Sequence, residues 1–424
     1  MGTIAALREL DSTQRHTVAA SFLGWTLDAF DYFLLVLVIP EVARSFHVGI
    51  TEVTFALLLT LAFRPLGALI FGRLADRFGR RPVLMLDVIL YSVLELACAF
   101  APSLVVLLVL RALFGIAMGG EWGIGASLAM ESIPPKSRGI VSGLLQSGYP
   151  CGYLIGALLY GLLFNSIGWR GMFVLGAAPA LLVLYIRSKV PESPVFEQRL
   201  RSGARRDVRT AMRGHWGLFV YLMLLMAAFN MFSHGSQDVY PTFLKSQKHF
   251  DTHLVSMLTI VLNLGALVGG LAFGAWSERI GRRRAMVIAA LLALPVIPLW
   301  TYGGSIVLLG IGAFLIQVAV QGAWGVVPSY LNELSPDDVR GTLPGFAYQL
   351  GNLIAAGTGT ILAWLAATRG GDFAFAQSVW IGGVAIVLAL LAGLGPESRG
   401  VAFGNVGGAH RELVPSGPVR RQIT

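Results

Sequence analysis

The chain has 424 residues, a formal net charge of +9 at pH 7, and a composition that is 55% hydrophobic and only 13% charged. A water-soluble domain of this length would carry roughly a quarter charged residues, so this chain lacks the polar side chains to cover a globule in water. Composition therefore excludes an ordinary soluble protein and indicates a chain that folds in lipid, where each spanning helix needs ~20 mainly apolar residues.

Twelve apolar stretches of this kind follow one another along the chain, separated by Pro, Gly and charged residues. Backbone groups within lipid must be hydrogen-bonded inside the segment, so these stretches are predicted to be helices rather than barrel strands. The expected fold class is an all-α membrane protein with twelve transmembrane helices. The stretches lie near residues 17–39, 52–72, 83–101, 103–126, 140–163, 170–187, 216–244, 254–274, 285–303, 305–328, 342–366 and 373–394.

Most of the 32 Lys and Arg fall in the alternate loops that share a side with the N-terminus. The positive-inside rule then predicts a multi-pass protein of the inner (plasma) membrane with both termini in the cytoplasm. The basic charge is thus explained by topology and by attraction to the lipid bilayer, which argues against nucleic acid as a partner. The first stretch lacks a cleavage site and is expected to remain as a span.

No pattern typical of enzymes is present. Cys98 and Cys151 both lie in predicted spans, and they form neither a disulfide framework nor a metal-ligand spacing. A Gly-x-x-x-x-Gly-Lys-Ser/Thr loop for nucleotide phosphates is missing as well. We therefore expect no metal, no cofactor and no enzymatic activity. A membrane sensor would be expected to carry a soluble signalling domain, for which the longest polar segments are too short.

The chain repeats itself at an offset of 202 residues. The segment Gly72–Arg81 (GRLADRFGRR) recurs at 274–283 (GAWSERIGRR), and the same offset relates Trp122 to Trp324. One offset at separated places indicates a duplication of six spans. The domains predicted from it are an N-terminal six-helix half at 1–187, a cytoplasmic linker at 188–215, a C-terminal six-helix half at 216–394 and a cytoplasmic tail at 395–424.

Two parallel six-helix halves resemble the Major Facilitator Superfamily, and the Gly-x-x-x-Asp-x-x-Gly-Arg-Arg loop resembles its cytoplasmic signature. Gly72 would permit close helix approach, and Asp76 could pair with an arginine or with the N-terminus of a neighbouring helix. Such a contact would close a gate on the cytoplasmic side and would break on opening. The expected gating residues of the two copies are Gly72, Asp76, Arg77, Gly79, Arg80, Glu278, Gly281 and Arg282.

Residues 230–242 read NMFSHGSQDVYPT. They match every fixed position of N-x-x-[ST]-H-x-[ST]-Q-D-x-x-x-T, and so resemble the signature of Jen-type lactate/pyruvate permeases within the sialate:proton symporter family. In that family the signature lies on the translocation path. The resemblance implies proton-coupled symport of small monocarboxylates such as lactate or pyruvate by alternating access. Sialic acid or another organic acid, aromatic acids included, is the alternative substrate.

The residues of this stretch point to a cavity independently of the family. Asn230, His234, Gln237 and Asp238 fall within an arc of ~100° on one helix face. A polar face in lipid is expected to look into a water-filled cavity, although hydrogen bonding between helices is the other interpretation. His234 is expected to donate a hydrogen bond to the substrate, with a proton switch as the alternative.

Arg64 lies nine residues before Arg73, which places it ~13 Å along a helix and near the membrane midplane. Its guanidinium offers a bidentate fork for a carboxylate, so we expect Arg64 to bind a small organic anion. A permanent salt bridge to Asp28 or Asp31 is the alternative. With positions that agree with the Jen-type pattern, the expected substrate-binding residues are Arg64, Asn230, His234, Gln237, Gln349 and Asn352.

Charged residues inside spans are costly and functional by default. A carboxylate that loses its arginine partner when the anion arrives can take up a proton, which would couple the two. Asp28 and Glu121 are the first choice, with structural ion pairs as the alternative for each. A structural role for Arg111 is equally open. The expected proton-coupling residues are Asp28, Glu121, Asp31, Asp238 and Arg111.

Other residues near these positions receive structural interpretations. Asp87 and Glu95 in the third span are expected to pair with cations. Trp25 and Trp122 are expected to pack in the core rather than to recognise substrate. By analogy with the superfamily, the protein is expected to be monomeric.

Overall fold

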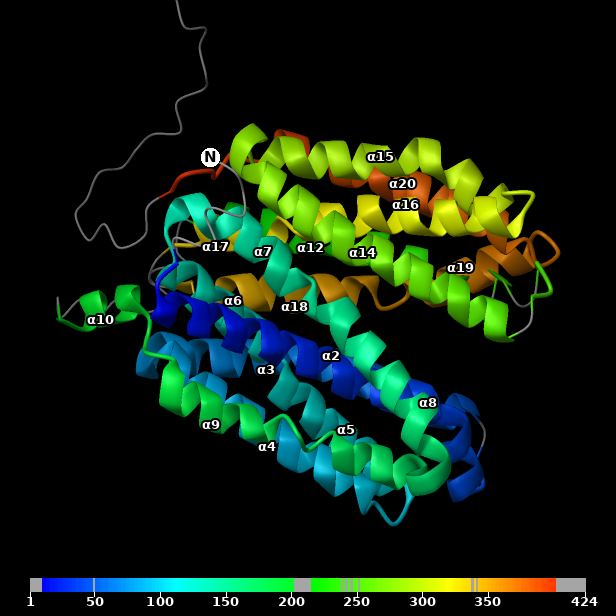
Figure 1. Cartoon of the computed structure of the whole chain (residues 1–424), viewed down its shortest axis with the longest axis horizontal. Helices are drawn as coiled ribbons and strands as arrows, with labels where there is room; N and C mark the ends of the chain where they lie inside the picture. Colours follow the sequence, from blue (N-terminus) through cyan, green and yellow to red (C-terminus); the bar gives the residue numbers. More distant parts are fainter. Residues whose placement is uncertain are drawn as a thin grey trace, which may run out of the picture.

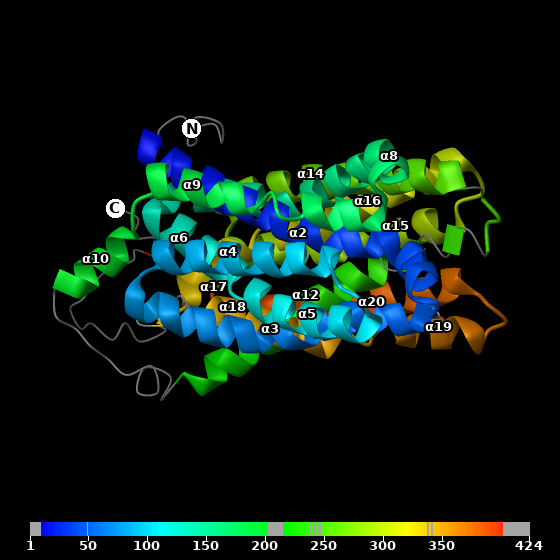
Figure 2. The ribbon, with the colours of Figure 1, turned by 90° about the horizontal axis from the view of Figure 1, so that it is seen from below.

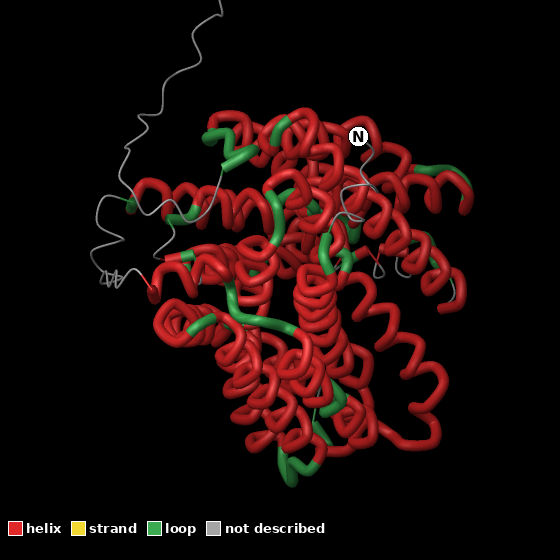
Figure 3. The backbone as a smooth tube through the Cα atoms, turned by 60° about the vertical axis from the view of Figure 1, so that its left-hand side comes forward, coloured by secondary structure: helices red, strands yellow, loops and turns green. Residues whose placement is uncertain are grey.

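The structure is a computed structural model in which every regular element of the described residues is a helix (Figure 3). Eleven helical segments among the described residues are long and apolar enough to cross a membrane. The predicted all-α membrane fold is thereby confirmed. The structure describes residues 10–48, 50–201, 215–237, 239–240, 243–244, 247–250, 252–336, 339–340 and 342–401.

The helices form two sets that lie side by side along the long direction of the molecule (Figures 1 and 2). The first set comprises α2 (Ser12–Phe46), α3 (Ile50–Phe78), α4 (Arg80–Ala99), α5 (Leu104–Met118), α6 (Glu121–Ser132), the 3-10 helix η1 (Pro135–Ser137), α7 (Arg138–Gln146), α8 (Gly148–Leu175), α9 (Ala180–Lys189) and α10 (Pro194–Arg201). The second comprises α12 (Trp216–Gln237), α14 (Thr252–Ile280), α15 (Arg282–Tyr302), α16 (Ile306–Trp324), α17 (Val327–Leu334), α18 (Leu343–Ala355), α19 (Thr358–Ala367) and α20 (Phe373–Leu394).

The predicted eleventh span, residues 342–366, is not among these eleven segments. It is divided into α18 and α19, and neither is long enough to cross a membrane alone. Ala356 and Gly357 between them keep right-handed helical dihedrals, with φ of −56° and −77°. The hydrogen-bond ladder is therefore interrupted while the chain continues in nearly the same direction, as it does at a helix kink.

The two sets meet where α7 packs against α14. A Cβ at Gly143 would lie 2.4 Å from the carbonyl oxygen of Gly270, and one at Gly274 would lie 2.6 Å from that of Gly139. Only glycine at these places lets the two backbones approach so closely, as in small-x-x-x-small packing of membrane helices. A second contact between the sets joins α3 to α18.

A close crossing of α3 and α5 holds the backbone of Arg64. A Cβ at Gly67 would lie 1.8 Å from the carbonyl oxygen of Ile116, and one at Gly119 would lie 2.1 Å from that of Arg64. Gly119 also ends α5, and the chain resumes as α6 at Glu121. The glycines of this region therefore fix where the Arg64 side chain begins.

Gly79 and Gly281 form the short connections from α3 to α4 and from α14 to α15. Their φ angles are +106° and +98°, a region that glycine adopts at no steric cost and other residues rarely enter. The sequence repeat is thus also a structural repeat at these two turns. We call the end of the bundle that carries these two turns the arginine-rich end.

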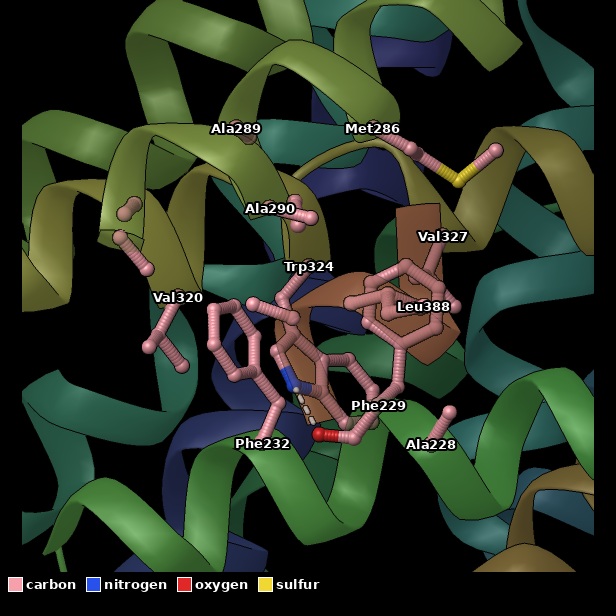
Figure 4. Close-up of a cluster of buried hydrophobic side chains, with 14 of the residues drawn as sticks. Ala228, Phe229, Phe232, Met286, Ala289, Ala290, Val320, Trp324, Val327 and Leu388 are labelled. Carbon is pink, nitrogen blue, oxygen red and sulfur yellow. Dashed lines mark hydrogen bonds between the residues drawn. The ribbon is translucent and has the colours of Figure 1, made fainter. Parts of the chain in front are cut away.

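Hydrophobic packing in the second set centres on Trp324 of α16 (Figure 4). Its indole Nε1–H donates to the carbonyl oxygen of Phe229 on α12, at 3.2 Å. Phe229, Phe232 and Leu388 are fully buried around it. The satisfied indole and its apolar surroundings fix the orientation of a ring that also reaches the cavity described below.

Candidate functional site

A cavity lies between the two helix sets. Its wall comes from α2, α3, α7 and α8 on one side and from α12, α16 and α18 on the other. Polar side chains from both sets meet in it, which is the arrangement a small-molecule site requires. The charged residues of the wall are Asp28 and Arg64, and its amide and imidazole side chains are Gln146, Asn230, His234, Gln321 and Asn352.

Arg64 and Asp28 form an ion pair in the cavity wall, with 2.5 Å between the Arg64 Nη2 and the Asp28 Oδ1. Arg64 is 4% exposed and Asp28 is 1% exposed. The Asp28 Oδ2 and the Arg64 Nε have no hydrogen-bond partner among the described residues. The guanidinium can therefore donate to a second anion without losing every contact with Asp28.

The polar face predicted on α12 reaches the cavity in part. Asn230 and His234 line it, and the His234 Nε2 lies 3.1 Å from the Asn352 Oδ1 of α18. Gln237 lies one turn further on and donates from Nε2 to the Gln317 Oε1 of α16, at 3.2 Å. Gln237 is thus engaged in hydrogen bonding between helices.

Two predicted residues are not placed in this cavity. Gln349 is buried, does not belong to the described wall, and has no hydrogen-bond partner among the described side chains. Asp238 lies outside the described residues. The structure therefore brings together Arg64, Asn230, His234 and Asn352 from the predicted substrate-binding set.

Aromatic rings form much of the remaining wall. Trp25 stacks on Tyr149 with 5.8 Å between ring centroids, and Tyr348 lies 5.7 Å from Trp324. Trp25 packs in the buried core as expected, and its ring also lines the cavity. The signal was present in the sequence. Trp25, Asp28 and Tyr32 share one face of α2 at the spacing i, i+3 and i+7.

The other predicted proton-coupling residues lie behind the cavity within the first helix set. Arg111 pairs with Glu95 at 2.8 Å, as expected for Glu95. Asp31, Asp87 and Glu121 are each at most 1% exposed, and none has a hydrogen-bond partner among the described residues. The expectation that Asp87 pairs with a cation is therefore wrong for the described chain.

Glu121 lines a smaller pocket of its own, together with Ser21, Trp25 and Trp122. Trp25 belongs to the walls of both this pocket and the central cavity. The two cavities therefore share one wall residue, although Glu121 itself lines only the smaller one.

At the arginine-rich end, an acidic side chain of each helix set contacts a helix start in the other set. The Asp76 Oδ2 accepts a hydrogen bond from Thr342 Oγ1 at 2.6 Å, and Thr342 is the N-cap of α18. The Glu278 Oε1 accepts from the backbone N–H of Gly139 in the first turn of α7. A carboxylate at a helix N-terminus is favoured by the helix dipole.

Arginines of the two turns complete this network. Arg80 lies 3.3 Å from Asp76 and 3.2 Å from Glu131, and Arg282 lies 2.9 Å from both Glu278 and Glu333. Two further pairs join the sets, Arg138 with Glu333 at 4.0 Å and Arg340 with Glu131 at 3.8 Å. The described contacts thus join the two helix sets at the arginine-rich end.

Two predicted gating residues are not part of this network. Arg77 is exposed, with its guanidinium carbon 5.2 Å from the ring of Phe78, and it forms no ion pair with a described residue. Gly72 is buried within α3, and none of the described contacts between the helix sets involves it.

Sequence reasoning missed Glu192 and Glu397. Glu192 accepts hydrogen bonds from the backbone N–H of Arg80 at 2.8 Å, and Glu397 accepts from that of Arg282 at 2.9 Å. Burial raises the pKa of Glu192, while hydrogen bonds from the backbone of Ser193 and Arg80 lower it. The signal was a second repeat, Pro-Glu-Ser, at residues 191–193 and 396–398.

Two protein-family profiles together match most of the chain. The profile described as "Major Facilitator Superfamily" matches residues 21–237, and the one described as "Sugar (and other) transporter" matches residues 208–399. The chain belongs to the Major Facilitator Superfamily. This superfamily member is a multi-pass membrane transporter and not an enzyme.

Curated relatives are transport proteins of similar length or longer. A carboxylic acid transporter protein homolog of Saccharomyces cerevisiae is 29% identical over 391 residues, which cover 86% of this chain but only 63% of the yeast protein. A probable 4-methylmuconolactone transporter of Cupriavidus pinatubonensis is 29% identical, with 95% of each chain covered. The sialic acid transporter NanX of Escherichia coli is 28% identical, with 81% of this chain and 85% of NanX covered.

Solved structures support the superfamily fold. The proton:xylose symporter XylE superposes with a TM-score of 0.76 at 18% identity, covering 93% of this chain and 98% of that one. The human organic anion transporter MFSD10 superposes with a TM-score of 0.73 at 20% identity, covering 90% of this chain and 100% of that one. At these identities the likeness establishes the fold alone.

Replacing Asp76 by Asn together with Glu278 by Gln is expected to open the arginine-rich end of this superfamily member. Each change removes a charged acceptor from a contact between the sets, which weakens closure by roughly tenfold or more. Ser329 is a suitable reporter, because its backbone N–H donates to Ser142 Oγ at 3.2 Å and its side chain is fully buried there.

The measurement is the rate at which a Ser329→Cys reporter, in a chain without Cys98 and Cys151, reacts with a bulky thiol reagent. We expect the rate to rise about tenfold in the double variant. Glu52→Gln is the control, because Glu52 is an exposed carboxylate at the opposite end of α3. Equal labelling rates of the reporter protein, the double variant and the Glu52→Gln control would mean that Asp76 and Glu278 do not hold the arginine-rich end closed.

Proposed function

We propose that the protein is a proton-coupled symporter of small monocarboxylates such as lactate or pyruvate, working by alternating access. The observation that supports this most directly is the Arg64–Asp28 ion pair in the wall of the central cavity, at 2.5 Å. An arginine fork binds a planar carboxylate through two parallel hydrogen bonds. The substrate carboxylate would take the place of Asp28 on Arg64.

Displacement of Asp28 supplies the coupling. A carboxylate that is 1% exposed and has lost its cation is strongly disfavoured in its charged form, so it takes up a proton. Binding of the anion and of the proton are then linked, because each makes the other less costly. Glu121 and Asp31 are the next proton carriers in this scheme, and Arg111, paired with Glu95, is a positioning residue.

The opposite wall would hold the rest of the substrate. His234 and Asn352 are hydrogen-bonded to each other at 3.1 Å, and Asn230 lies on the same face of α12. We assign His234 as a donor to the hydroxyl or keto oxygen of the substrate. A substrate that contacts Arg64 in one set and His234 in the other would draw the two sets together around it.

Two resemblances support a carboxylate as the substrate. The stretch 230–242 is similar to the Jen-type signature, and the yeast relative is named a carboxylic acid transporter protein homolog.

Under the positive-inside expectation the arginine-rich end faces the cytoplasm, with both termini on that side. By analogy with the superfamily, we propose that the monomer is the transporting unit.

The aromatic wall favours a second candidate substrate, a larger unsaturated or cyclic organic acid. Trp25, Tyr32, Tyr149, Trp324 and Tyr348 all line the cavity, and stacked rings bind flat ligands. The relatives named for sialic acid and for 4-methylmuconolactone agree with a bulkier acid. In this case Arg64 would keep the same role.

The test is uptake of radiolabelled L-lactate into proteoliposomes with an imposed inward proton gradient. Matched vesicles without a gradient, or with an uncoupler, are the control. We expect lactate to accumulate with the gradient and to equilibrate only without it. Gradient-driven uptake of sialic acid or of an aromatic acid, without lactate, would select the second candidate. Transport of none of these acids would contradict both.

A further inference from the structure

A basic pocket lies at the arginine-rich end of the second helix set, away from the central cavity. It is formed where α14 ends, α15 begins and α20 ends (Figure 1). Its wall contains four arginines, Arg279, Arg283, Arg284 and Arg399, beside a single carboxylate, Glu397. We propose that this pocket binds the phosphate of an anionic phospholipid headgroup.

The positive charge of the pocket is not neutralised by the described protein. Glu397 is occupied by hydrogen bonds from the backbone N–H groups of Arg282, at 2.9 Å, and Arg283, at 3.3 Å. Arg279 and Arg284 are exposed, and their guanidinium groups form no hydrogen bond or ion pair with a described residue. Both are free to donate to phosphate oxygens, for which the guanidinium fork is suited.

Apolar surface adjoins the same pocket. Val287 and Ile288 of α15 belong to its wall, and Ile288 is 41% exposed. Leu390 and Leu394 at the end of α20 are 58% and 85% exposed. If the arginines hold the phosphate, the attached acyl chains would lie against the exposed apolar side chains of α15 and α20. This continuity favours a phospholipid over a free phosphate or a soluble nucleotide.

Comparison of equivalent positions in the two helix sets shows which of the four arginines are not required for the fold. At the offset of 202, Arg283 corresponds to Arg81, but Arg284 corresponds to Pro82. Arg81 donates to the carbonyl oxygen of Arg187 at 2.6 Å, and Arg283 donates in the same way to Gly393. The first set therefore forms the equivalent arginine-to-carbonyl hydrogen bond without an arginine at the position that corresponds to Arg284.

The Pro-Glu-Ser repeat likewise shows an arginine that is present only in the second helix set. Arg399 follows Ser398, whereas Pro194 follows Ser193 in the first copy. Arg399 donates to the carbonyl oxygen of Arg279 at 2.6 Å, which holds it beside the pocket. Two of the four arginines thus exist only in the second set, and a ligand particular to that set accounts for them.

The site is connected to the gate. Glu397 holds the start of α15, where Arg282 pairs with both Glu278 and Glu333. A lipid bound to the arginines that flank Arg282 would stabilise α15 in the arrangement described here. Anionic lipid is therefore expected to favour closure of the arginine-rich end, whatever acid is transported.

The test is thermal unfolding of the purified full-length protein in detergent, with phosphatidylglycerol, phosphatidylcholine or inorganic phosphate added. We expect phosphatidylglycerol alone to raise the Tm by several degrees. The apparent affinity for it should fall about fivefold in Arg284→Gln and about twenty-five-fold in the double variant Arg279→Gln, Arg284→Gln. Neither side chain has a described partner, so the variants are expected to fold.

The matched control is Arg73→Gln with Arg187→Gln, which removes the same charge from exposed positions at the same end of the first set. It should keep the wild-type response to phosphatidylglycerol. An equal loss in the control would mean general attraction to a basic surface. An equal response to inorganic phosphate would assign a free anion instead. Phosphatidylglycerol retained equally by wild type and the double variant in native mass spectrometry would overturn the site.

Discussion

Replacing Arg64 by lysine is expected to lower the initial rate of proton-driven uptake by about 10- to 100-fold. Lysine keeps the charge beside Asp28 but loses the planar fork that holds a carboxylate through two hydrogen bonds. The protein should remain folded, because the buried Asp28 still has a cation beside it. The measurement is initial uptake into proteoliposomes at substrate concentrations below saturation.

Arg44→Lys is the matched control for this change. Arg44 also pairs with a carboxylate, the Glu41 Oε1 at 2.8 Å, but the Arg44 side chain is 76% exposed. Exposed pairs of this kind contribute little, so uptake should be unchanged. Near-normal uptake by Arg64→Lys would show that Arg64 forms only a permanent structural ion pair with Asp28.

Replacing Asp28 by asparagine is expected to abolish accumulation against a gradient while leaving exchange of substrate across the membrane. Asparagine cannot take up the proton that compensates the substrate anion. It also leaves Arg64 buried without its counter-ion, which costs about 3–5 kcal/mol of stability. Substrate binding should restore part of that stability, because the carboxylate supplies the missing charge. Proton-driven accumulation and counterflow are measured side by side, with Tm determined in the presence and absence of substrate.

Asp31→Asn separates two explanations of this result. Asp31 lies one turn further along α2, is fully buried, and has no hydrogen-bond partner among the described residues. It does not line the cavity, so its neutralisation should weaken coupling less than that of Asp28. Loss of accumulation in Asp31→Asn together with normal accumulation in Asp28→Asn would transfer the proton site to Asp31.

The contacts between the helix sets at the arginine-rich end could be inferred from sequence to a large extent because the motif that forms them is repeated. Asp76 and Glu278 occupy equivalent positions at turns that require Gly79 and Gly281, and both meet a helix start as the charge of a carboxylate suggests. Arg77 belongs to the same motif yet lies exposed. A motif identifies a loop, whereas its contribution to an interface depends on which of its side chains faces the partner helix.

The cavity was harder to infer. Helical periodicity correctly grouped Asn230 with His234, but it also included Gln237, which bonds to Gln317 of α16 instead. The ring of Tyr149 comes from α8, for which the sequence offered no signal of recognition, and the ring of Tyr348 lies on α18 beside the predicted Gln349 and Asn352 but was not itself predicted. Periodicity gives the face of one helix, while a cavity wall depends on the rotation and crossing of several.

By itself, the sequence determined that this is an all-helical membrane protein built from a duplicated unit, with charge concentrated at one end. These properties follow from the length of the apolar stretches and from the internal repeat, both of which can be observed in the sequence alone. Only the tertiary structure decided that Arg64 pairs with Asp28 rather than Asp31, and that Glu121 lines a second pocket. It also placed Arg279 and Arg284, whose side chains have no partner among the described residues, in one pocket beside α15. These outcomes depend on how closely glycines let the helices approach, and that is a property of packing between segments far apart in sequence.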